Sequence, residues 1–105
     1  MSKYDIQRAI ELVDDYCQKE FGAEADFSDM TLVPIAHTTI TDEELPVQVW
    51  VDIENLRFLY SVDEDIVDEI AYEEPLGFLL ALENLDFGTL ISEAEDAWER
   101  RDQNE

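Results

Sequence analysis

The sequence has very few positive charges for its length. Its 105 residues include 28 Asp and Glu but only 6 Lys and Arg, so the formal net charge is -22. Binding to nucleic acid requires a basic patch that displaces the counterions of the phosphates, and binding to an anionic membrane surface requires one as well. Because the cations are scattered singly or in pairs, we expect no direct binding to nucleic acid or to a membrane.

Cysteine, histidine and glycine are scarce as well. The single cysteine, Cys17, cannot form an internal disulfide, which fits a reducing compartment and predicts a cytoplasmic location. His37 is the only histidine, so the usual zinc ligand sets cannot be assembled. The glycines are isolated and build no phosphate-binding loop: Gly22, Gly77 and Gly88. We therefore expect neither a metal nor a cofactor.

Motifs that mark enzymes, exported proteins and membrane proteins are missing. No Gly-x-Ser-x-Gly nucleophile motif occurs, and the longest mainly apolar run, residues 76–82, is about a third of a membrane span. The first residues carry charges where a signal peptide needs an apolar stretch. Two carboxylates can act as general acid and base, but among 28 acids such a pair arises by chance. The sequence therefore predicts a protein that is not an enzyme.

Residues 63–74 have the length of a calcium-binding loop, with acids at the first, third and last positions. Such a loop needs glycine at its sixth position for a sharp turn, where this chain has Asp68. The fifth position, which supplies an oxygen ligand, is Val67. We expect only unspecific cation binding by these carboxylates.

The chain has enough apolar residues to fold as one domain. Hydrophobic residues make up 46% of it, which separates it from acidic disordered tails. Apolar residues three and four positions apart predict a helix over residues 3–21, with Ser2 as its cap and Gly22 at its end. On this helix Cys17 falls on the apolar face, which favours a buried core residue over a reactive thiol. Residues 30–40 predict an edge strand, because Pro34 lacks an amide donor.

The strongest local pattern is a β-hairpin over residues 47–62, with Glu54 and Asn55 at its turn. This register places Val51 opposite Phe58 and makes one face apolar. On the other face it places Asp52 opposite Arg57, Trp50 opposite Leu59 and Gln48 opposite Ser61. A slip of one residue would destroy both sets. We expect the ion pair of Asp52 and Arg57 to be exposed and to add little stability.

The rest of the chain predicts a third strand and two more helices. Residues 63–74 fit either a helix or a strand, and we predict the strand. Residues 76–82 predict a short buried helix, and Asp86 can cap a last helix, while the tail 100–105 should fray. The fold class is therefore α+β. We expect one acidic domain over residues 1–105, with an N-terminal helix, a mainly antiparallel sheet of three or four strands, and two C-terminal helices.

Acidic residues are concentrated in residues 42–44 and 63–74 and in the last helix. Trp50 lies on the hairpin face opposite the apolar one. This face is either open to solvent or covered by the first or last helix. If it is open, Trp50 and Leu59 form an apolar spot surrounded by acids, as in an interface hot spot. The candidate partner-binding residues are Asp63, Glu64, Asp65, Asp68, Glu69, Glu73, Glu74, Asp42, Glu43, Glu44 and Trp50.

Two segments of the chain resemble a known class of domains. These segments are Leu45-Pro-Val-Gln-Val-Trp-Val-Asp-Ile-Glu-Asn-Leu-Arg-Phe, continuing through Tyr72, and Leu82-Glu-Asn-Leu-Asp-Phe-Gly-Thr-Leu-Ile. They are similar to the small accessory domains associated with large polyvalent proteins of phages and conjugative elements. In size and charge the chain also resembles DNA-mimicking inhibitors carried by mobile elements, such as anti-restriction and anti-CRISPR proteins.

Charge and resemblance together favour two functions over a third, an enzyme with a carboxylate site. The other interpretation of the acidity is that it only provides solubility or reflects a salt-loving host. Rows of carboxylates on a rigid fold can present a field similar to that of DNA, which speeds encounter with a basic groove. The chain would then be an inhibitor or decoy that occupies the nucleic-acid-binding groove of a basic protein, such as a host defence nuclease. The alternative is an immunity- or adaptor-type protein that binds one basic partner without mimicking DNA.

Overall fold

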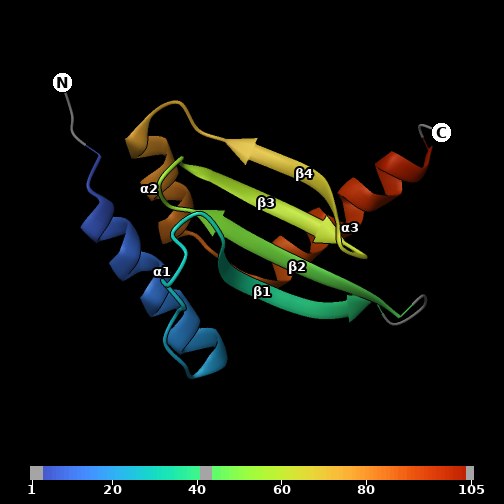
Figure 1. Cartoon of the computed structure of the whole chain (residues 1–105), viewed down its shortest axis with the longest axis horizontal. Coiled ribbons are helices and arrows are strands. Elements are labelled where there is room, and N and C mark those ends of the chain that lie inside the picture. The colour runs from blue at the N-terminus through green and yellow to red at the C-terminus, as the bar shows by residue number, and fades with distance from the viewer. Residues whose placement is uncertain (1–3, 41–43, 104–105) are drawn as a thin grey trace.

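The fold is a four-stranded antiparallel sheet with three helices, as described by a computed structural model for residues 4–40 and 44–103 (Figure 1). The order along the chain is α1 (Ile6–Phe21), β1 (Val33–Ile40), β2 (Leu45–Asp52), β3 (Arg57–Val62), β4 (Asp65–Ala71), α2 (Pro75–Glu83) and α3 (Phe87–Gln103). The strands lie side by side in sequence order, so β1 and β4 are the edges. The predicted α+β class is confirmed. None of the helices in these ranges has the length and apolar content needed to cross a membrane.

Helix α1 begins three residues later than the sequence predicts. Its cap is Asp5, whose side chain accepts a hydrogen bond from the amide of Arg8 at 3.0 Å. The predicted cap, Ser2, lies outside the described residues. The predicted end is confirmed, because Gly22 adopts a φ of 67° and its amide bonds to the carbonyl of Gln18. Cys17 is buried on the inner face of this helix, as expected.

The hairpin of β2 and β3 has the predicted register, with Val51 opposite Phe58 and Asp52 opposite Arg57. The turn is longer than predicted, because it spans residues 53–56 and Leu56, at a φ of 53°, takes the left-handed conformation. Asp52 organises this turn by accepting bonds from the amide and the side chain of Asn55, both at 2.9 Å. Asp52 is 0% exposed, so the expectation of an exposed ion pair is wrong.

The predicted strands on either side of the hairpin are confirmed. β1 pairs with β2 along the sheet edge, with an irregularity in its register just after Pro34. β4 pairs with β3 and has one bulge between Tyr60 and Ser61 of its partner, which shows that residues 65–71 form a strand and not a helix. The segment 63–74 was ambiguous from periodicity alone, and its pairing with β3 decided its conformation.

The two C-terminal helices follow the prediction only in part. α2 buries Phe78 and Leu82, but Leu76 and Leu80 are 66% and 51% exposed, so it is not the buried helix that was expected. α3 is capped by Asp86, as predicted, since its carboxylate accepts bonds from the amide and hydroxyl of Thr89. α3 continues to Gln103, so fraying from residue 100 is not observed.

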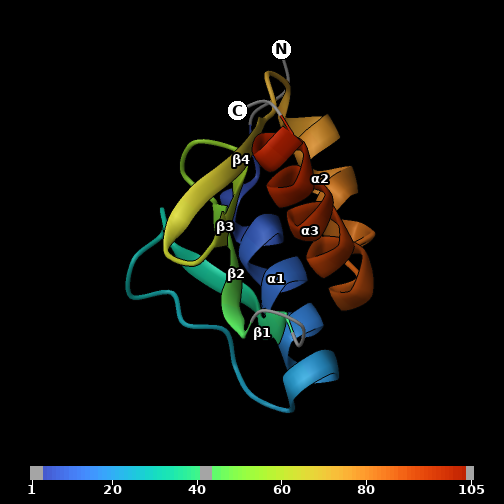
Figure 2. The ribbon, with the colours of Figure 1, turned by 90° about the vertical axis from the view of Figure 1, so that its right-hand side faces the viewer.

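The three helices lie on one side of the sheet (Figure 2). α3 crosses all four strands and α1 packs against α2. The segment between α1 and β1 passes along the other side, where the carbonyl of Met30 accepts a bond from the amide of Ile53 at 2.8 Å. The core therefore lies between the sheet and the helices, and its fully buried side chains include Val49, Tyr60 and Phe78.

Candidate interaction surface

The predicted acidic residues of 63–74 do not share one surface. Asp63 and Glu64 form the turn between β3 and β4, and Asp65 opens β4. The amide of Asp63 bonds to the carbonyl of Pro46 at 2.8 Å, so this turn lies beside the start of β2, which Glu44 directly precedes. Asp42 and Glu43, predicted for the same surface, lie outside the described residues. One end of the sheet thus gathers exposed acids from two connections.

The acids in the middle of β4 point to opposite faces, because successive strand residues alternate. Asp68 is opposite Tyr60 on the helix side, and Glu69 is opposite Leu59 on the other side. Each has a basic neighbour: Glu69 contacts Arg57 at 2.8 Å, and Asp68 lies 3.9 Å from Arg100. These two predicted site residues are therefore separated by the sheet and partly neutralised.

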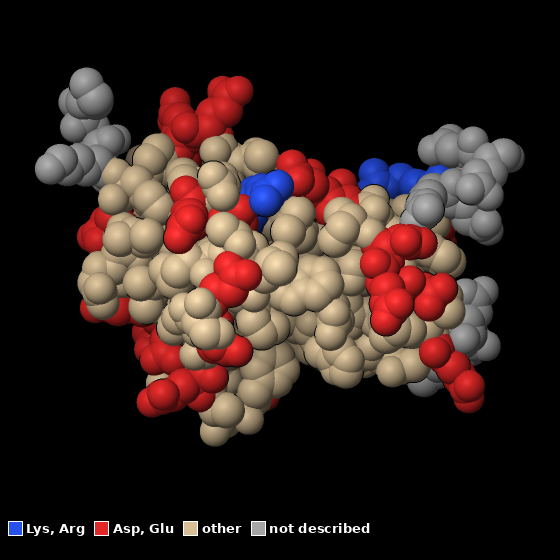
Figure 3. All heavy atoms as spheres, in the orientation of Figure 1, with Lys and Arg blue, Asp and Glu red and all other residues tan. Residues whose placement is uncertain are grey.

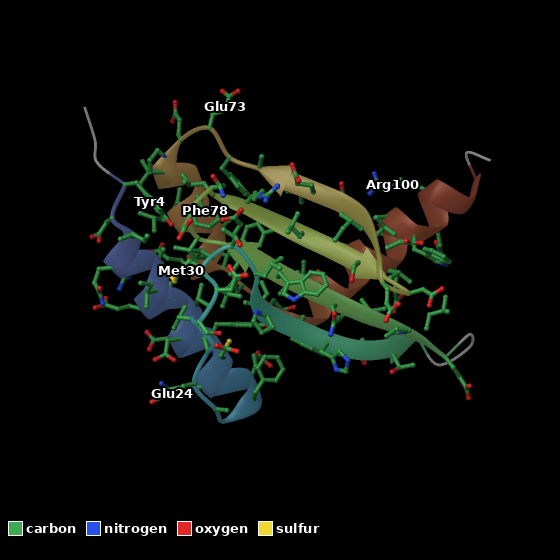
Figure 4. All side chains as sticks on the ribbon, in the orientation of Figure 1. Tyr4, Glu24, Met30, Glu73, Phe78 and Arg100 are labelled. Carbon is green, nitrogen blue, oxygen red and sulfur yellow. The ribbon has the colours of Figure 1, made fainter. Side chains whose placement is uncertain are left out.

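Glu73 and Glu74 lie at the far end of β4 from Asp63. They are exposed in the connection to α2, and Figure 4 shows Glu73 near α2, well away from Arg100 on α3. The strand between the two groups rises about 3.3 Å per residue. The sequence cluster is thus distributed along the whole length of an edge strand.

Trp50 lies on the side of the sheet that carries no helix. Its neighbours Val49 and Val51 are in the core, so the alternation of β2 directs Trp50 away from it. The possibility that the first or last helix covers Trp50 is therefore wrong. Leu59 opposite it is nevertheless only 7% exposed. Figure 3 shows that uncharged residues occupy the middle of this side and that acids gather toward its margins.

A groove between β4 and α3 brings acids together that the sequence did not group. Its acidic part has a volume of about 500 Å³ and is lined by Asp68, Ile70, Glu93, Asp96, Glu99 and Arg100. Four carboxylates thus face one guanidinium. On α3, the acids Glu93, Asp96 and Glu99 follow one another at intervals of three residues, which places them along one face of the helix.

An apolar part continues this groove toward α2. It has a volume of about 210 Å³ and shares Ile70 and Glu93 with the acidic part. Its other lining residues are Phe58, Tyr60, Tyr72, Ala81, Asn84, Leu85, Asp86, Thr89 and Leu90. At the junction, the hydroxyl of Tyr60 donates a bond of 2.6 Å to Glu93 Oε2. This bond joins the middle of the sheet to α3 and fixes one carboxylate at the boundary between the two parts.

The tyrosines report how tightly the helices cover the sheet. Burial raises the pKa of Tyr4 to about 12, and it also raises the pKa values of Tyr16, Tyr60 and Tyr72. In Tyr60 the bond to Glu93 adds to the effect of burial. Burial likewise raises the pKa of the Cys17 thiol to about 11, so this cysteine is protonated at neutral pH.

We expect Tyr4, Tyr16 and Tyr60, whose pKa values burial raises most, not to ionise near pH 10 in the folded protein. Their folded pKa values lie above the unfolded value of about 10, so the stability they contribute is complete below that pH and is lost as the pH rises through the folded values. Tyrosinate absorbance should therefore rise together with loss of the circular dichroism signal. The guanidinium-denatured chain, as the control, should titrate near pH 10. Ionisation of these tyrosines at pH 10 with intact dichroism would contradict the packing.

Within the described ranges, no group of three or more His, Cys, Asp or Glu is arranged to hold a metal ion. The four carboxylates of the groove are open to solvent on a broad surface, and the only histidine, His37, is on β1. The groove was missed from sequence because it depends on α3 crossing β4. The signal that could have suggested its helical wall is the three-residue spacing of Glu93, Asp96 and Glu99.

Comparison with known proteins gives no family for this chain. No protein-family model matches it, and neither curated protein sequences nor solved structures show a significant match. The structure by itself defines the class: a small α+β domain in which an antiparallel meander is covered by helices on one side.

Proposed function

We propose that this protein is a non-catalytic acidic binding protein that mimics DNA. It acts as an inhibitor or decoy in the nucleic-acid-binding groove of a basic protein, such as a host defence nuclease. The observation that carries the proposal is a groove with carboxylates on both walls, Asp68 on β4 and Glu93, Asp96 and Glu99 on α3. In duplex DNA, two rows of phosphates flank a groove in the same way.

The spacing of these charges supports the comparison. Acids three residues apart on a helix are separated by about 4.5 Å along its axis, and one strand of DNA carries a charge about every 3.4 Å. On the β4 side, the bulge in the pairing with β3 sets Asp65 opposite the core residue Val62, on the same side of the sheet as Asp68. Rigid elements hold both rows, so a basic partner meets a fixed field that speeds association. Buried Cys17, without a disulfide, fits a cytoplasmic location as part of this proposal.

The test begins by identifying partners that the protein captures from cells carrying its gene. Duplex DNA should then displace the protein from its partner, and binding should weaken steeply with salt. The groove variant carries Asp96→Asn and Glu99→Gln on the α3 wall of the groove and Asp63→Asn and Asp65→Asn around the start of β4. It should associate about tenfold or more slowly at low salt, through loss of steering. These four positions are exposed, and each replacement keeps the size of the side chain.

The matched control removes the same charge elsewhere. Glu11→Gln, Asp15→Asn, Glu20→Gln and Glu24→Gln change four exposed residues of α1 and the segment after it. If mimicry is correct, this variant should lose much less of the association rate than the groove variant. Equal effects of the two variants, or a partner that DNA does not displace, would overturn DNA mimicry.

One observation favours a second function, that of an adaptor for a basic partner. Trp50 and Leu59 pair on the side of the sheet without helices, and Figure 3 shows that acids gather toward the margins of that side. Aromatic anchors in such a setting often dominate binding energy. In an adaptor, Trp50→Ala would abolish binding, the groove variant would keep most of it, and DNA would not compete.

A further inference from the structure

The groove between β4 and α3 is unusual in joining an apolar part to an acidic part. The two parts have Ile70 and Glu93 in common, so a ligand can span both without leaving the surface. The apolar part is lined by residues of β3, β4, α2 and the start of α3, and the acidic part by residues of β4 and α3 as far as Arg100. Figure 4 shows Arg100 toward the end of α3.

The apolar part has the size of a side-chain pocket. Its volume of about 210 Å³ is several times the roughly 30 Å³ that a water molecule occupies in the liquid. It is also smaller than the roughly 300–1,000 Å³ typical of sites for small organic ligands. Phe58 and Leu90 are almost fully buried, while Ile70, Tyr72 and Leu85 are partly exposed. The pocket therefore offers apolar walls to one inserted side chain.

The acidic part of the groove favours a positively charged ligand. Asp68, Glu93, Asp96 and Glu99 outnumber Arg100, and the distance of 3.9 Å between Arg100 and Asp68 leaves that pair weak. Glu93 is positioned in advance by the hydroxyl of Tyr60, whose ring is 2% exposed. A carboxylate held before binding loses less conformational entropy when it meets a cation.

We propose that the groove binds a basic peptide segment of the partner protein, in which an apolar side chain stands within a few residues of Lys or Arg. The apolar side chain fills the pocket beside Ile70 and Tyr72, and the cation lies among the carboxylates of α3. The inference rests on the proposed function, since it names what the basic partner presents to this surface. It adds a specificity that a field of charges alone does not provide.

The test compares two fluorescent peptides, Lys-Lys-Lys-Leu-Phe-Lys-Lys-Lys and Lys-Lys-Lys-Ala-Ala-Lys-Lys-Lys, at physiological salt. The first should bind the full-length protein about tenfold or more tightly, because burying one apolar side chain provides that much affinity. The methyl resonances of Ile70, Leu85 and Leu90 should shift with the first peptide and not with the second. Equal affinities, or shifts confined to the region of Trp50, would overturn the inference.

Two sets of variants measure separately how much the apolar pocket and the carboxylates contribute to peptide binding. Ala81→Phe fills the apolar part from α2 and should abolish the preference between the peptides, with Ala81→Leu as a smaller filling variant if the first does not fold. The matched control, Ala71→Phe, adds the same ring at an exposed position of β4 outside the groove and should leave the preference intact. Asp96→Asn with Glu99→Gln should weaken both peptides together. A preference that survives in a folded Ala81 variant would refute the pocket.

The two proposals fail in different ways. If DNA displaces the captured partner but the two peptides bind equally, mimicry stands and the pocket is refuted. If the peptides differ as expected but DNA does not displace the partner, mimicry fails and the groove still binds a basic segment of the partner.

Discussion

Replacing Phe58 by alanine should destabilise the fold by about 3 to 5 kcal/mol, the range for truncating a fully buried aromatic residue. Phe58 is 3% exposed, and its ring lies 5.6 Å from that of Phe78 on α2 and 6.0 Å from that of Tyr72. These contacts join the centre of the sheet to the helix layer. The alanine variant should lose aromatic pair energy as well as buried area. Urea unfolding followed by circular dichroism gives the free energy directly.

Phe21→Ala is the matched control for this measurement. Phe21 is the last residue of α1, is 48% exposed, and packs its ring against the rings of Tyr16 and Phe87. Because less of its area is buried, its loss should cost clearly less than that of Phe58. Comparable costs for the two variants would mean that the ring of Phe58 is not part of the core.

Asp52→Ala should have an effect of similar size, about 3 to 5 kcal/mol, because the buried carboxylate accepts three hydrogen bonds and each bond to a charged group contributes about 1.5 kcal/mol or more. The carboxylate is 0% exposed and accepts bonds from Arg57 Nε at 2.6 Å and from Asn55 at 2.9 Å. It therefore holds the turn between β2 and β3. Thermal unfolding of the variant should show a much lower midpoint than the parent protein.

Loss of Arg57, the basic member of the ion pair with Asp52, should also lower stability, but for a different reason. Arg57→Ala leaves the Asp52 carboxylate buried with only Asn55 as its donor, so it should lower the midpoint more than Arg8→Ala, which breaks only exposed pairs with Glu11 and Glu83. Asp52→Asn is the conservative control for Asp52→Ala, and its unfolding midpoint should lie above that of the alanine variant. An Arg57 variant that behaves like the Arg8 variant would show that Asp52 is hydrated in solution.

The hairpin register could be derived from sequence because it depends on local alternation. Only one alignment of residues 47–62 pairs the valines of β2 with Phe58, Tyr60 and Val62 on a single face, and this is the alignment observed. The turn was predicted less well. The observed turn of four residues includes Leu56 in the left-handed conformation. It is also held by a hydrogen bond from the amide of Ile53 to the carbonyl of Met30, more than twenty positions earlier. The burial of Asp52 is likewise not indicated by the local pattern, which places this residue on the side of the sheet without helices.

In the candidate site, too, the local sequence predicts some features and distant contacts decide others. The sequence identified the acids of 63–74, but a strand with a period of two sends Asp68 and Glu69 to opposite faces and separates Asp63 from Glu73 by its whole length. Grouping by sequence distance therefore combined residues that the fold keeps apart. The acids that do meet, Asp68 and those of α3, come from elements far apart along the chain.

The sequence by itself determined the α+β class, the hairpin and its register, the caps at Gly22 and Asp86, and the excess of negative charge, because each depends on composition or on residues close together in the chain. Only the tertiary structure decided that the three helices share one side of the sheet, that Trp50 faces away from them, and that β4 and α3 enclose a groove. These features depend on how amphipathic elements pack to bury their apolar faces together, and such packing is set by contacts between distant segments.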